Sequence, residues 1–122
     1  MSSNGVSPLI CRQGQIGHVQ SEVTTVTATS TITIGSNATI VINNTGAIAV
    51  TIGNAPEAGD YLEIICLDTG GMGSTVVLPS GVTWDGTNDT ATFDADNERI
   101  VCRAISATRW YVVANPNSVA FS

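Results

Sequence analysis

The chain contains no lysine, and charged side chains of either sign make up only 11% of its 122 residues. Soluble globular proteins carry about 25% charged residues, so this protein relies on uncharged polar groups for much of its solubility. Its four cations are arginines, and its ten acidic residues give a net charge of -6. This balance argues against a nucleic-acid binder, whose affinity comes from cations that neutralise phosphates, and against binding to anionic membranes.

Charge is missing altogether between Glu22 and Glu57. Within this gap, the stretch TTVTATSTITIGSNATIVI (residues 24–42) consists mainly of threonine, serine, alanine and β-branched aliphatic residues. A small domain normally keeps its surface soluble with mixed charge. Either hydroxyl and amide groups take that role here, or a second copy of the chain covers the segment. We expect a homo-oligomer.

Long hydrophobic runs are also absent. The first twenty residues lack the apolar run of a signal peptide or a membrane span. No export signal is visible, so we expect the three Asn-x-Thr sequons to have no special meaning. Cysteine is limited to Cys11, Cys66 and Cys102, an odd number with a spacing that fits neither a disulfide framework nor a zinc site. We expect reduced cysteines that serve as small buried apolar groups.

Residues 1–20 are predicted to form an extended N-terminal arm, followed by an all-β domain of residues 21–122. Glycine or proline recurs in the arm at positions 5, 8, 14 and 17, so no long element is expected there, although residues 9–11 can form one short strand. Such an arm is either disordered or lies on a neighbouring molecule.

From Glu22 onward, the dominant pattern is the alternation of apolar and polar residues that is typical of β-strands. Turn-forming residues separate the alternating segments at intervals of about 8 to 12 residues, and no segment has a helical period. The sequence therefore predicts a single antiparallel β-sandwich or barrel, jelly-roll-like, after the arm. The expected strands cover residues 23–27, 31–34, 38–42, 47–52, 61–67, 74–78, 82–84, 90–93, 99–105 and 110–113.

Alternate residues of a strand point to opposite faces of its sheet, which predicts the side chains that form the core. In the strand at 61–67, Tyr61, Glu63, Ile65 and Leu67 point away from the predicted inward set, and Arg103 points outward from the strand at 99–105. The predicted inward sets are Ile48, Val50 and Ile52; Leu62, Ile64 and Cys66; and Ile100, Cys102 and Ala104.

No catalytic constellation stands out, so we expect neither an enzyme nor a bound cofactor. The densest acidic group can offer oxygen ligands to calcium, but its spacing does not match an EF-hand loop, and β-turns use aspartate to accept backbone N–H bonds. The only histidine, His18, lies in the arm, which gives a catalytic triad no rigid scaffold. We expect solvated turns and no metal site at Asp85, Asp89, Asp94 and Asp96.

Two further motifs have competing interpretations. The glycines of residues 68–73 do not lead into a helix, so we expect a flexible loop there and no phosphate-binding loop. Trp84, Trp110 and Tyr111 have aromatic faces of the kind on which carbohydrate-binding modules stack sugars, yet they are equally suited to filling a core.

The second half of the chain contains an ordered series of short motifs: AGDYLEII (58–65), VLPSG (77–81), ATFDA (91–95) and SATRWYVVAN (106–115). Their order, a glycine with a core strand, then Leu-Pro-x-Gly, Phe-x-Ala and Trp-x-Val, resembles a β-rich module of tailed-bacteriophage virion proteins. Such modules occur in head decoration (cement) proteins and in parts of tail fibres. The resemblance covers roughly half of the chain.

This resemblance implies a bacteriophage capsid decoration protein that is homotrimeric, made in the host cytoplasm and attached to the outside of the capsid in the virion, where it stabilises the shell. The N-terminal arm would contact the major capsid protein by adding a strand to it. Neither nucleic acid nor a membrane is an expected partner. The predicted capsid contacts are Leu9, Ile10, Arg12 and His18, and the predicted subunit interface consists of Thr25, Thr27, Thr31, Thr33 and Arg103.

Three alternatives stay open. A tail-fibre or receptor-binding segment uses similar β-modules, usually as one piece of a longer chain. A carbohydrate-binding module would bind a glycan through Trp84 or Trp110 and would ignore capsids. A dimer is an alternative to the trimer.

Overall fold

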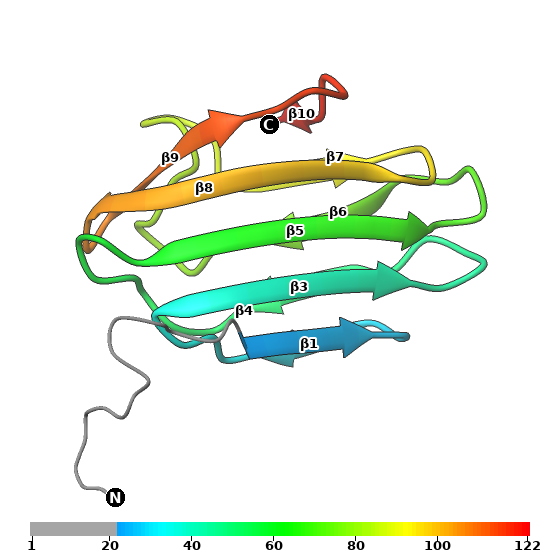
Figure 1. Cartoon of the computed structure of the whole chain (residues 1–122), viewed down its shortest axis with the longest axis horizontal. Helices are drawn as coiled ribbons and strands as arrows, with labels where there is room; N and C mark the ends of the chain where they lie inside the picture. The colour runs from blue at the N-terminus through cyan, green and yellow to red at the C-terminus, as the bar shows by residue number, and fades with distance from the viewer. Residues whose placement is uncertain (1–21) are drawn as a thin grey trace, which may run out of the picture.

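The computed structural model describes residues 22–122, which form ten β-strands and no helix. The strands make two five-stranded sheets that pack face to face (Figure 1). The front sheet has the order β1 (Glu22–Val26), β3 (Asn37–Asn43), β5 (Tyr61–Asp68), β8 (Glu98–Ser106) and β9 (Arg109–Ala114). The back sheet has the order β2 (Ser30–Ile32), β4 (Ala49–Ile52), β6 (Ser74–Val77), β7 (Thr90–Phe93) and β10 (Ala120–Phe121). The expected all-β sandwich is confirmed.

From β1 to β6 the chain alternates between the two sheets. β1, β3 and β5 therefore lie side by side in the front sheet and pair in parallel, and β2, β4 and β6 do the same in the back sheet. In Figure 1 the chain runs along the front from left to right and returns behind, so this part consists of three stacked coils of one front and one back strand each. We call residues 22–77 the coil half.

From β7 onward the pairing is antiparallel, in both sheets. The antiparallel pairing expected from the sequence is therefore wrong among β1 to β6 and is found only where β7, β8, β9 and β10 pair. We call residues 78–122 the antiparallel half. Alternation of inward and outward side chains is the same in parallel and antiparallel strands. The pattern that locates the strands does not distinguish the two pairings.

The core lies between the two sheets and consists of the alternate residues that the sequence places inward. Ile48, Val50 and Ile52 are buried, as are Leu62, Ile64, Cys66, Ile100, Cys102 and Ala104. Arg103 is exposed, as expected from its position between Cys102 and Ala104. No helix that is long and apolar enough to cross a membrane occurs in the part of the chain that the structure describes.

Side chains and turns hold successive coils in register. The Asn54 side chain accepts a hydrogen bond from the Ile34 N–H and donates one to the Ile34 carbonyl, which extends the pairing of β2 and β4 beyond the end of β2. At the opposite end, Gly70 has a positive φ of 63° and lies against the backbone of Thr45, in the corresponding turn of the preceding coil. A Cβ atom at this position would overlap the Thr45 carbonyl.

Aromatic side chains fill the core of the antiparallel half. The ring centroid of Trp84 lies 6.4 Å from that of Trp110 and 6.2 Å from that of Phe121. The brief extended piece predicted at residues 82–84 forms a single bridge, between Thr83 and Arg109, while the two-residue strand β10 has no counterpart among the predicted strands. β10 completes the back sheet beside β7 and places Phe121 against Trp84.

Candidate functional site

The predicted arm and its capsid contacts lie outside the described residues. This applies to Leu9, Ile10, Arg12 and His18, as well as to Cys11. Their role in binding a capsid stays a prediction.

The four threonines predicted for the subunit interface all lie in the first coil and are all exposed. They do not share one face, however, because Thr25 belongs to β1 of the front sheet and Thr31 to β2 of the back sheet. Thr27 and Thr33 follow these strands. Arg103 lies on β8, which β3 and β5 separate from β1 in the front sheet. The structure therefore places the threonines in the first coil, which forms one edge of both sheets. Arg103 lies away from that edge, on β8.

The first coil supplies an edge strand to each sheet. Within residues 22–122, β1 pairs only with β3 and β2 pairs only with β4. The other edge of each strand carries backbone N–H and C=O groups that can pair with an added strand. Because the only charged residue of this coil is Glu22, charge does little to discourage such pairing.

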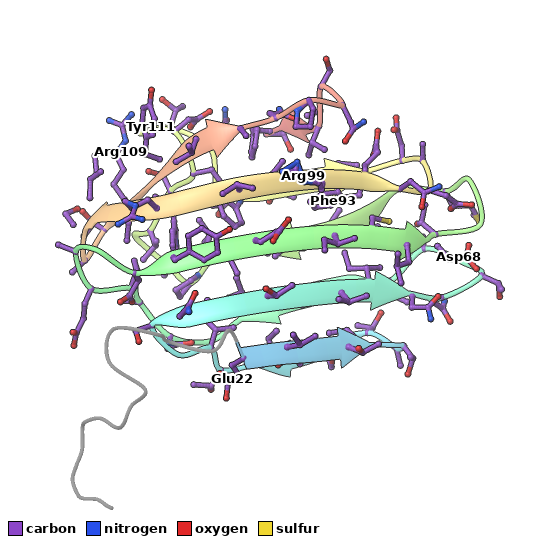
Figure 2. The ribbon with its side chains drawn as sticks, in the orientation of Figure 1. Glu22, Asp68, Phe93, Arg99, Arg109 and Tyr111 are labelled. Carbon is purple, nitrogen blue, oxygen red and sulfur yellow. The ribbon has the colours of Figure 1, made fainter. Side chains whose placement is uncertain are left out.

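The outward side of the front sheet is apolar, and we call it the front face. Six large hydrophobic side chains are exposed within residues 22–122, and all except Met72, which lies in a loop, belong to strands of the front sheet. Tyr111 is labelled on β9 in Figure 2. The five on the front sheet are Val23, Leu67, Ile105, Tyr111 and Val113, with exposed fractions between 47% and 61%.

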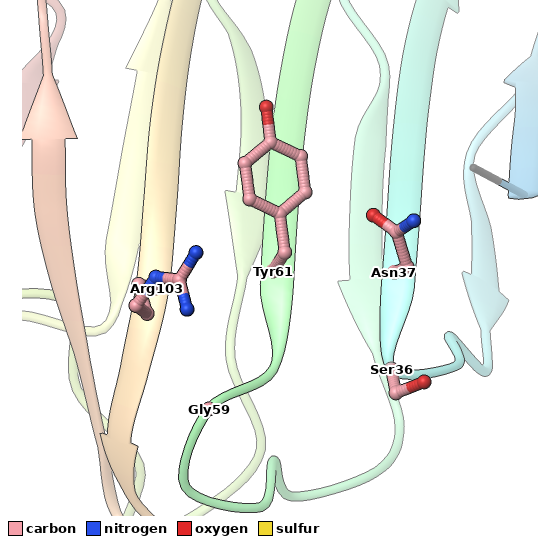
Figure 3. A pocket seen from close by; sticks show the side chains of 5 residues that line it. All are labelled: Ser36, Asn37, Gly59, Tyr61 and Arg103. Carbon is pink, nitrogen blue, oxygen red and sulfur yellow. The ribbon is translucent and has the colours of Figure 1, made fainter. Parts of the chain in front are cut away.

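A row of polar and aromatic side chains crosses one end of the front face. The strand register places Asn37 beside Tyr61, Tyr61 beside Arg103, and Arg103 beside Tyr111. Ser36, Asn37, Gly59, Tyr61 and Arg103 line a shallow open pocket of about 420 Å³, where Figure 3 shows the Arg103 guanidinium extending from β8 towards β5.

The charges on the front face are few and unevenly paired. The Arg99 Nε atom donates to a carboxylate oxygen of Glu63 at 3.4 Å, an ion pair between partly exposed groups that stabilises the fold by at most about 1 kcal/mol. Arg103 has no hydrogen bond or ion pair with any other residue in the range 22–122. The front face therefore offers one cation without a partner to an incoming molecule.

The outward side of the back sheet, the back face, has a different chemistry. Its cross-strand rows contain only small side chains: Thr31, Thr51, Val77 and Thr90 in one row, and Ala49, Thr75, Thr92 and Ala120 in the next. None of them carries a charge, and none is a large exposed hydrophobic side chain. The back face is therefore smooth and hydroxyl-rich, whereas the front face has projecting apolar groups.

Two of the clustered aspartates accept backbone hydrogen bonds, Asp85 within its own turn and Asp96 from a neighbouring turn. Asp85 accepts hydrogen bonds from the N–H groups of Thr87 and Asn88 and from the Asn88 side chain. The bond from the Asn88 N–H is the main cause that lowers the pKa of the Asp85 carboxyl. Asp96 accepts a bond from the Thr69 N–H. Among residues 22–122, no group of three or more His, Cys, Asp or Glu side chains is placed to hold a metal ion.

The two described cysteines are free and buried. Burial, followed by the charges of Glu98, Asp96 and Asp68, raises the pKa of the Cys66 thiol to about 11. Burial alone raises the pKa of the Cys102 thiol to about 12. Both groups stay protonated at neutral pH, and since the thiolate is the nucleophile and the metal ligand, they act as apolar core groups, as the sequence predicts.

The tryptophans also belong to the core. Trp84 and Trp110 are 0% and 1% exposed, so neither offers a ring face on which a sugar can stack. The alternative of a glycan site on these two residues is wrong, because their rings fill the space between the sheets. Tyr111, by contrast, is 55% exposed and belongs to the front face.

The front face was not identified as a site from the sequence, although one signal of it is visible there. In YLEIICLD, the strand β5, the outward residues Tyr61, Ile65 and Leu67 are almost as apolar as the inward ones. A strand that is apolar on both sides is typical of a sheet covered on both faces. In this structure only the inward face of β5 is covered, by the back sheet.

Comparisons with known proteins add no family to this description. The sequence matches no protein-family model and no curated protein.

Proposed function

We propose that the chain is a structural protein of a tailed-bacteriophage virion: a head decoration protein that binds the outside of the capsid as a homotrimer and stabilises the shell. The proposal takes its virion context from the motif series of the second half of the chain. The observation that carries it is the first coil, which presents two edge strands and almost no charge next to the N-terminal segment.

The edges of β1 and β2 support binding by strand addition. An extended segment that pairs with an exposed sheet edge gains main-chain hydrogen bonds without needing a deep pocket. Edge strands of soluble proteins are commonly protected by charged side chains, prolines or bulges, and none of these occurs in β1 or β2 except Glu22. An edge of this kind suits a permanent contact between proteins.

Stabilisation of the shell follows from mass action. A protein that binds only the assembled, expanded shell stabilises that state in proportion to how tightly it binds. Many equivalent copies then oppose the opening of the shell together.

Capsid binding is tested by sedimentation of the purified chain with capsids of the phage that encodes it, which lack this protein. We expect wild type to sediment with the capsids. A chain without residues 1–20 should keep its β-sheet circular dichroism and stay in the supernatant. Thr31→Lys, which puts a cation on the edge strand β2, should weaken sedimentation, because Lys opposes edge pairing.

Thr75→Lys is the matched control, since Thr75 also lies on the back face but on β6, inside the sheet. It should bind capsids as wild type does. A wild-type chain that stays in the supernatant contradicts the decoration function; if it then binds host cells, the receptor-binding alternative holds. A chain without residues 1–20 that still binds capsids contradicts the role of the arm.

A further inference from the structure

The front face gathers almost all of the exposed apolar bulk of the described residues. Leu67, Tyr111 and Val113 project from β5 and β9, and half-buried apolar residues such as Val41, Ile65 and Val101 lie on the strands between the edges of the sheet. Exposed apolar side chains gathered on one face of a soluble domain mark an interaction site. The face therefore belongs against another surface.

Charge favours a second copy of the chain as that surface. The chain is acidic overall, at -6, so two copies repel one another over most of their surface. On the neighbouring strands β5 and β8 the outward charges are Glu63, Arg99 and Arg103, an excess of one positive charge. Copies that meet here keep their acidic surfaces apart, and Glu63 of one copy can face a cation of the other.

The row of polar and aromatic side chains beside the pocket supplies side chains that can hold a partner in place. Tyrosine and arginine are among the residues that contribute most to binding at protein interfaces, and here Tyr61, Arg103 and Tyr111 are cross-strand neighbours. Arg103 has no partner within residues 22–122. A second copy can supply its missing carboxylate from Glu63, which lies one row away on the same face.

The size of the face suits a stable complex. Five strands about 4.8 Å apart, with a rise of about 3.3 Å per residue, give a projected area on the order of 600 Å². The projecting side chains increase the accessible area beyond this value. Each partner in a stable protein complex buries roughly 800 Å², so the front face is large enough to hold copies together.

We infer that the front face is the surface through which copies of this chain bind one another. The inference deepens the proposed function, on which its link to a trimer rests. Of the first-coil threonines it keeps only Thr25 in the interface, because Thr25 lies on the same side of β1 as the exposed Val23. Thr31 and the unpaired edges of β1 and β2 are then free for a different partner. Buried apolar area drives the association, and the Arg103 to Glu63 contact orients it.

Light scattering of the full-length chain at about 100 μM tests this inference. We expect a mass of three times the 12.6 kDa of one chain, and no loss of mass as sodium chloride is raised, because salt screens the repulsion between acidic copies. Val113→Glu should weaken association at least about tenfold, which corresponds to about 1.4 kcal/mol, because it buries a carboxylate among apolar groups.

Met72→Glu is the matched control. Val113 and Met72 are both 57% exposed, but Met72 lies in the loop between β5 and β6, off the front face. It should associate as wild type does. Leu67→Glu, on β5, gives a second test if Val113→Glu does not fold, as judged by circular dichroism.

Two results would overturn the inference: a monomeric wild type, or a folded Val113→Glu or Leu67→Glu chain that keeps the mass of the Met72→Glu control. A stable mass of two chains supports the interface and contradicts only the trimer. Capsid sedimentation decides the decoration function separately. If wild type is monomeric and Leu67→Glu no longer sediments with capsids, the front face binds the capsid and not a second copy.

Discussion

The coil half and the antiparallel half of the sandwich are filled by different kinds of side chain. The coil half has a core of isoleucine, valine, leucine and alanine with one cysteine, whereas both tryptophans and both phenylalanines of the chain follow residue 78. Stacked coils repeat the same narrow cross-section, so side chains of similar size pack above one another. Where the parallel coils end and the pairing becomes antiparallel, large aromatic side chains fill the space between the sheets.

The largest effect is expected from emptying the aromatic core of the antiparallel half. Trp84→Ala removes a fully buried ring that packs against Trp110 and Phe121, and it should lower the free energy of unfolding by about 3–5 kcal/mol. Urea unfolding at 25 °C measures the change. Met72→Ala, at an exposed loop position, should stay within about 0.5 kcal/mol of wild type. Equal effects of the two substitutions would mean that the aromatic cluster does not hold this half together.

The corresponding test in the coil half is Gly70→Ala. Its Cβ atom would meet the Thr45 carbonyl of the preceding coil at a positive φ, so strain and overpacking together should cost about 2–4 kcal/mol. Gly71→Ala separates the two causes, because Gly71 also has a positive φ of 72° but no atom within 4 Å of an added Cβ. It should cost only the backbone strain of about 1–2 kcal/mol. Similar unfolding curves for the two variants would rule out close stacking of the turns.

A smaller effect is expected from alkaline pH, and it should affect both halves in the same direction. Cys66 lies in the coil half and Cys102 in the antiparallel half, and burial raises the pKa of each thiol from an ordinary value of 9.0, to about 11 and about 12. Above pH 9 the unfolded chain loses these protons while the folded chain keeps them. Stability should therefore fall by about 1.4 kcal/mol per thiol for each pH unit, until the folded thiols ionise.

Urea unfolding between about pH 8 and 10.5 measures this dependence. Cys66→Ala and Cys102→Ala should each remove one thiol's share of the slope, although both lower stability at neutral pH by leaving a small cavity. A slope that neither substitution changes would show that other groups cause the alkaline loss.

Most strands of the fold are predictable from the sequence because burial imposes a strict alternation of side chains. Ile48, Val50 and Ile52 point inward as expected, and the predicted strand at residues 90–93 coincides with β7. β10 escapes prediction because two residues are too few to show a period. The parallel pairing of β1, β3 and β5 escapes for a different reason: it depends on which sheet each strand joins, and this choice leaves no mark on the alternation.

The candidate site was harder to predict than the fold. The exposed threonines of the first coil follow from the charge gap, and the outward position of Arg103 follows from its neighbours. The sequence shows that Leu67, Tyr111 and Val113 are apolar, but it does not show that they share a face, because that depends on β5 and β9 joining the same sheet. The burial of Trp84 likewise depends on residues far from it in the sequence, because Trp110 of β9 and Phe121 of β10 pack against its ring.

The sequence by itself determined that this protein is an acidic all-β chain with a core of alternate residues, because composition and alternation are local properties of the chain. Only the tertiary structure decided that residues 22–77 wind into parallel coils, that β1 and β2 become edge strands, and that the front face is apolar while the back face is smooth. These features depend on contacts between residues far apart in the sequence. Such contacts are set by how whole strands pack to exclude water from the core, and no short segment specifies them alone.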